Sequence, residues 1–141
     1  EKKIQDKVKK MSTQAVSFQL TLTNNLENKS VFYDDLIGEM TRFPLVYRYN
    51  ENHEDAYVKI QVNDDHIILE RVAQSNTEIR FDKSQGTQFF IKDASTEFMG
   101  EVETLQIKKM PQYLYVHYRL WVNNDIIAEQ EMELKVKVSE A

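Results

Sequence analysis

The chain has 141 residues, 41% of them hydrophobic and 29% charged, which is the size and balance of a single globular domain. It contains no cysteine, and this excludes disulfide bonds, thiolate metal ligands and cysteine nucleophiles. Its formal net charge of −5 argues against binding to nucleic acid, and no apolar run approaches the roughly 20 residues that span a membrane.

Residues 1–11 predict either a short helix or a flexible leader. Ile4, Val8 and Met11 are spaced four and three residues apart, as on one face of a helix. Lysines outnumber acidic residues here, and there is no apolar stretch typical of a signal peptide. We therefore expect a cytoplasmic protein in which residues 1–11 precede a single barrel domain, residues 12–141.

From Val16 onward, apolar residues recur at every second position, which is typical of strands with one buried face. Val16, Phe18, Leu20 and Leu22 form the first such series. Further strands are predicted around residues 30–42, 45–51, 57–62, 67–73, 79–81, 87–92, 97–109, 113–122 and 126–138. Turns of Asn, Asp, Ser and Gly separate them.

Two of these strands require a local irregularity. Gly38 could introduce a kink or bulge into the second strand. The apolar parity changes between Val102 and Leu105, which predicts a bulge near Glu103-Thr104. Nine or ten antiparallel strands of this length must form a sandwich or close into a barrel, because long free edges invite aggregation. We expect an all-β, closed antiparallel barrel of about 8–10 strands with a short N-terminal helix.

The order of several segments carries a family resemblance. These segments are Tyr47-Arg48-Tyr49-Asn50-Glu51, Ile67-Ile68-Leu69-Glu70-Arg71, Phe81, Met99-Gly100-Glu101-Val102-Glu103-Thr104 and the hairpin at 118–123. In this order the chain resembles the YwiB-like family of small proteins, known mainly from Gram-positive bacteria. The resemblance implies a calycin-type barrel, similar in architecture to lipocalins, and no established activity. The chain departs from the family pattern in Val72-Ala73-Gln74, where a glycine is frequent, and in the basic residues 1–10.

Motifs for metal binding and catalysis are missing from the sequence. His53, His66 and His117 lack the short spacing of a metal cluster, and three scattered glycines cannot form a phosphate loop. Glu101 and Glu103 share one face of a strand, but such rows usually coat a solvated surface. We therefore expect a protein that is not an enzyme and holds no metal or cofactor.

Five polar or aromatic residues share the parity of the buried apolar positions: Arg71, Tyr47, Tyr49, Glu51 and Tyr118. If that face lines the barrel, a buried guanidinium there needs partners. One hypothesis is a small apolar or anionic ligand in the barrel interior, with Arg71 as the anchor and the tyrosines as walls. The alternative is a barrel filled by its own side chains, which serves as a non-enzymatic interaction or dimerisation module.

The opposite face of residues 113–122 carries Tyr113, Tyr115, His117, Arg119 and Trp121. Exposed, this face would suit a protein partner or a homodimer. Alternatively, the N-terminal helix could cover it with Ile4, Val8 and Met11.

Overall fold

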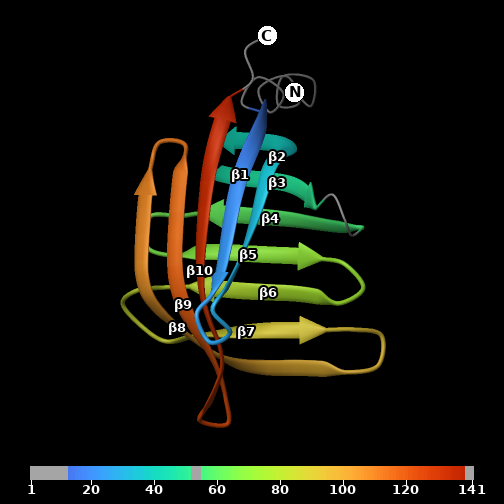
Figure 1. Cartoon of the computed structure of the whole chain (residues 1–141), viewed down its shortest axis with the longest axis vertical. Helices are drawn as coiled ribbons and strands as arrows, with labels where there is room; N and C mark the ends of the chain where they lie inside the picture. The colour runs from blue at the N-terminus through green and yellow to red at the C-terminus, as the bar shows by residue number, and fades with distance from the viewer. Residues whose placement is uncertain (1–12, 52–54, 139–141) are drawn as a thin grey trace, which may run out of the picture.

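A computed structural model describes residues 13–51 and 55–138, and in this part of the chain it shows ten β-strands (Figure 1). The strands are β1 (Thr13–Asn24), β2 (Lys29–Arg42), β3 (Leu45–Glu51), β4 (Ala56–Val62), β5 (Ile67–Val72), β6 (Asn76–Phe81), β7 (Thr87–Lys92), β8 (Glu97–Met110), β9 (Tyr113–Val122) and β10 (Asp125–Val138). The helix or leader predicted for residues 1–11 lies outside the described residues. Within them, no helix is long and apolar enough to cross a membrane.

The strands close into one antiparallel barrel, as the sequence predicts. Each strand pairs with its neighbour in the chain, and β1 closes the barrel by pairing with β10 from Val16–Val138 to Asn24–Gln130. In Figure 1, β1, β9 and β10 run along the long axis of the molecule, while β3 to β7 cross it. The long strands β2 and β8 belong to both groups. β8 pairs with β7 through residues 97–102 and with β9 through residues 101–110, whereas β2 pairs with β1 through residues 29–41 and with β3 through residues 38–42.

The barrel turns its corners at β2 and β8, where two glycines and two bulges lie. The bulge predicted near Glu103-Thr104 is found as a register shift between Thr104 and Gln106. The bulge considered at Gly38 is not there, because Gly38 pairs regularly with Val16 and Tyr49.

The irregularity in β2 lies instead at Asp34 and Asp35, and Asp35 has a φ of 62°. Gly38 instead allows the backbone of β3 and the ring of Phe18 to lie close to β2. A Cβ atom there would lie 1.9 Å from the carbonyl oxygen of Arg48, and one at Gly100 would lie 2.4 Å from the Phe89 ring.

The inward-facing side chains of the barrel are buried against one another. The inward positions of all ten strands form one core whose largest buried members are Tyr47, Phe18, Phe81, Phe89, Leu20, Leu36, Ile60, Ile67, Leu114 and Leu134. Phe18 packs edge-on against Tyr47, with ring centroids 5.8 Å apart, and also contacts Tyr49. The barrel is therefore stabilised by a core of aromatic and aliphatic side chains.

Candidate functional site

Arg71 and Glu51 form an ion pair at one end of the barrel. Glu51 is the last residue of β3 and Arg71 lies near the end of β5, with β4 between them. The Arg71 guanidinium donates from Nε to Glu51 Oε1 at 3.1 Å and from Nη2 to Oε2 at 2.9 Å. The small side chains of Ala56 and Val58, which lie opposite Glu51 and Arg71, leave room for this bridge across β4. This two-point contact gives the guanidinium a carboxylate partner from the protein itself.

Tyr49 and Tyr118 complete the predicted cluster at this end. Burial raises the pKa of Tyr49, and the nearby charge of Glu51 raises it further, while Arg71 opposes the shift. The Tyr118 hydroxyl donates to Gln130 Oε1 at 2.6 Å, and its ring packs on Phe81. Burial also raises the pKa of Tyr118. Both phenols are therefore neutral and buried, and the Tyr118 hydroxyl is hydrogen-bonded.

The fifth predicted residue, Tyr47, faces the other end of the barrel. There it forms part of an open groove of about 1020 Å³ between the β2–β3, β4–β5 and β8–β9 turns. The apolar residues of this groove are Met40, Phe43, Pro44, Leu45, Tyr47, Val62, Met110 and Pro111. Met40 and Tyr47 are buried residues of the core, whereas Phe43 and Met110 are exposed on its rim. The groove thus joins the filled interior to an apolar surface.

Cationic side chains stand on the rim of the same groove. Arg42 donates from Nε and Nη2 to Gln14 Oε1 at 3.1 and 2.9 Å, and Lys109 Nζ donates to the carbonyl oxygens of Asn63 and Asp64 at 2.9 Å. Both cations are therefore held in place by neutral oxygen atoms. Burial raises the pKa of the Tyr47 hydroxyl, and the Arg42 charge opposes this shift, which places that charge close to the groove floor.

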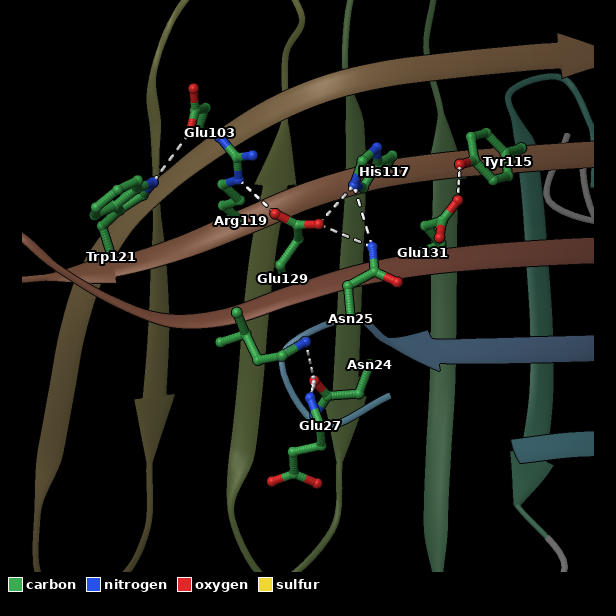
Figure 2. Close-up of polar contacts among 11 residues, drawn as sticks. Asn24, Asn25, Glu27, Glu103, Tyr115, His117, Arg119, Trp121, Glu129 and Glu131 are labelled. Atoms are coloured by element: carbon green, nitrogen blue, oxygen red, sulfur yellow. Dashed lines mark hydrogen bonds and ion pairs between the residues drawn. The ribbon is translucent and has the colours of Figure 1, made fainter. Parts of the chain in front are cut away.

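The second predicted surface, the outer face of β9, is a network of hydrogen bonds with the acidic residues of β10 (Figure 2). Glu129 accepts from Arg119 Nε at 2.6 Å and from Asn25 Nδ2 at 2.9 Å. The hydrogen bond from Arg119, followed by that from Asn25, lowers the pKa of Glu129 to about 2. His117 lies 3.4 Å from the same carboxylate. Glu129 therefore ties the β1–β2 turn to the middle of the sheet.

The aromatic residues of this face also have carboxylate partners. Tyr113 donates to Glu133 at 2.9 Å, Tyr115 donates to Glu131, and Trp121 Nε1 donates to Glu103 at 3.1 Å. Burial and the bond to Glu131 raise the pKa of Tyr115 to about 12. The predicted helix cover falls on residues outside the described part, and the face itself is a hydrogen-bonded ladder with polar groups outward.

Metal-binding residues do not gather in the described part of the chain, where no group of three or more His, Asp or Glu side chains could hold an ion. His66 belongs to the β4–β5 turn and contacts Asp65 and Asn63. The histidine at position 53 lies outside the described residues.

Four of the five site residues predicted from the sequence lie near one another in the structure: Arg71, Glu51, Tyr49 and Tyr118. The fifth, Tyr47, lies beside a groove that the sequence analysis did not predict. Gln130, the acceptor for Tyr118, shares the inward parity of Met132 and Leu134 and could have been found on that ground. The groove rim comes from Phe43-Pro44 and Met110-Pro111, which contain both prolines of the chain. The sequence feature that could have indicated this groove is the large apolar residue directly before each proline.

Comparisons with known proteins agree on the fold. A family model described as "Domain of unknown function (DUF1934)" matches residues 23–134. The crystal structure of the ywiB protein from Bacillus subtilis is similar, with a TM-score of 0.68 over 92% of this chain and 94% of that one. Its sequence identity of 10% limits that likeness to the fold. No curated protein sequence matches the chain.

Proposed function

The chain belongs to the DUF1934 family of domains of unknown function, and we propose that it is a binding protein whose groove at the β2–β3 end takes a small ligand with an apolar body and one anionic group. The observation that carries this proposal is the groove itself, in which an apolar floor of Met40 and Tyr47 lies beside the Arg42 guanidinium. Ligand sites commonly combine apolar walls with a few placed polar groups.

The groove fits this chemistry better than the interior does. Core side chains from all ten strands pack together in the barrel, and Glu51 already neutralises Arg71 with two hydrogen bonds. A ligand anion that reached Arg71 would have to displace that carboxylate and push core residues apart, at a cost of several kcal/mol. Binding at the open groove leaves the Arg71–Glu51 pair and the packing of the core in place. The ligand therefore meets the barrel at its end, against Tyr47, rather than at Arg71.

Arg42 and Lys109 give the groove its preference for an anion. Asp64 and Asp65 lie on the same rim, but Asp65 is engaged by His66 Nδ1 at 2.6 Å. Arg42 lines the groove beside Tyr47, and its charge acts on the pKa of the Tyr47 hydroxyl, so we expect a carboxylate or sulfonate on the ligand to point toward Arg42. A chain without cysteine needs no oxidising compartment, and we expect this binding to take place in the cytoplasm.

Calorimetric titration with octanoate and 1-octanol tests the proposal, because the two probes share the apolar body and differ in charge. We expect octanoate to bind more tightly, and Arg42→Gln to remove most of that difference. Met110→Glu should weaken octanoate binding about ten-fold or more by placing a charge on the apolar rim. Met99→Glu is the matched control, since Met99 and Met110 both lie on β8 and are 54% and 55% exposed. Equal losses in both variants, or no binding by the wild type, would overturn the proposal.

A further inference from the structure

One edge of β2 has no neighbouring strand over much of its length in the described part of the chain. Residues 29–41 pair with β1 along one side, but on the other side pairing with β3 involves residues 38–42 alone. In Figure 1 the first part of β2 runs beside β1 while β4 to β7 cross both strands. Such an edge presents unpaired backbone donors and acceptors, which can pair with another strand.

The side chains of this edge are apolar and exposed. Val31, Phe32 and Ile37 are 48%, 60% and 74% exposed. The stretch from Lys29 to Tyr33 is regular, because it pairs residue by residue with β1 from Asn24 to Leu20. The bulge at Asp34 and Asp35 ends that regular stretch. Proteins usually protect free edges with charges or bulges, and here the protection begins only after Tyr33.

We propose that this edge pairs with the same edge of a second copy of the chain, antiparallel and centred on Phe32. A two-fold axis through Phe32, perpendicular to the sheet, sets Phe32 beside its own copy on the outer face. It also sets Val31 opposite Tyr33 of the second copy. Aromatic pairs and aromatic pairs with β-branched residues are among the favourable cross-strand contacts. The same surface patch then serves both copies, as a two-fold interface requires.

Charge complementarity selects this register over its neighbours. Centring on Phe32 brings Lys29 of each copy to the Asp34-Asp35 pair of the other, so two oppositely charged contacts form. Centring on Val31 would put Glu27 opposite Asp35, and centring on Tyr33 would put Lys29 opposite Ile37. Exposed ion pairs contribute little affinity each, but both mismatched registers lose them, and the register centred on Val31 also gains repulsion.

Sedimentation equilibrium of the full chain over a range of concentrations tests this dimer. We expect Lys29→Glu and Asp35→Lys each to weaken self-association about ten-fold, because these two residues face each other in this register and each change turns two attractive contacts into repulsive ones. The double variant exchanges the charges and should restore association to within about three-fold of the wild type. Lys83→Glu makes the same charge change in the exposed β6–β7 turn and should leave association unchanged. Circular dichroism of each variant confirms that the barrel has folded.

Three results would overturn the proposal. The first is a wild-type chain that stays monomeric up to about 1 mM, where even weak complexes form. The second is a dimer that neither single charge reversal weakens, which would place the interface elsewhere. The third is a double variant that does not recover self-association, which would show that Lys29 does not pair with the acidic bulge of the second copy.

Discussion

Arg71 on β5 and Glu51 on β3 meet across β4, with Nη2 and Oε2 2.9 Å apart and side chains that remain 29% and 19% exposed. Their strands are not neighbours in the sheet, yet both side chains point inward at the same end of the barrel. The pair converts a charge that would be costly to bury into a two-point hydrogen-bonded bridge over Ala56 and Val58.

Removing one member of this pair should cost more than removing both. Arg71→Met leaves the Glu51 carboxylate without its bidentate partner, and we expect the free energy of unfolding to fall by about 1 to 3 kcal/mol. The double variant Arg71→Met/Glu51→Leu removes the orphaned charge and should recover most of that loss. Urea unfolding of the wild type, Arg71→Met, Glu51→Leu and the double variant measures the effect. A double variant as unstable as the sum of two single losses would contradict a structural ion pair.

The close approach at Gly38 predicts a large effect for one added methyl group. Gly38→Ala places a Cβ atom 1.9 Å from the Arg48 carbonyl oxygen and 2.9 Å from the Phe18 ring, so the pairing of β2 with β3 must shift. We expect a loss of about 3 kcal/mol in the free energy of unfolding. Gly86→Ala is the matched control, because its nearest atom would lie 4.0 Å away. That change should alter stability by less than about 1 kcal/mol.

The Glu129 network predicts a defined dependence of stability on pH. The pKa of Glu129 falls from 4.5 to about 2 on folding, so the folded state holds the charged form more tightly than the unfolded state does. The stabilisation is therefore fully present above pH 4.5 and is lost as the pH falls toward 2. We expect the difference in Tm between wild type and Glu129→Gln to be largest near pH 6 to 7, which lies above both values, and to vanish near pH 2. A difference that stays constant over this range would contradict the assigned role.

The sequence predicted the barrel well because its information is local and periodic. Alternation of apolar and polar residues marks a strand with one buried face, and the inward parity of Arg71 and Glu51 follows from the same rule. The groove could not be predicted in this way. Its rim combines Phe43 and Met110, which come from two separate turns, and nothing in a strand pattern says which turns share an end of the barrel.

The two bulges also differ in how well the sequence predicts them. The change of apolar parity after Val102 located the β8 bulge to within two residues, because a bulge reverses the face of every later side chain. The β2 bulge lies at the exposed residues Asp34 and Asp35, and the exposed Ile37 continues the parity of Val31 and Tyr33 past it, so the change of face is hidden in the sequence. From the sequence, we considered a bulge at Gly38 instead. In the structure, the small size of Gly38 allows Phe18 and Arg48 to pack closely against it.

The most direct test of the central claim is a two-dimensional amide NMR titration of the wild-type chain with octanoate. The groove predicts that the shifted amides cluster at the β2–β3, β4–β5 and β8–β9 turns, with Leu45, Val62 and Met110 among them. It also predicts little change near Glu51 and Arg71, at the opposite end of the barrel. Shifts centred on Glu51, Arg71 and Tyr49, with the turns unchanged, would place the ligand inside the barrel and contradict the account.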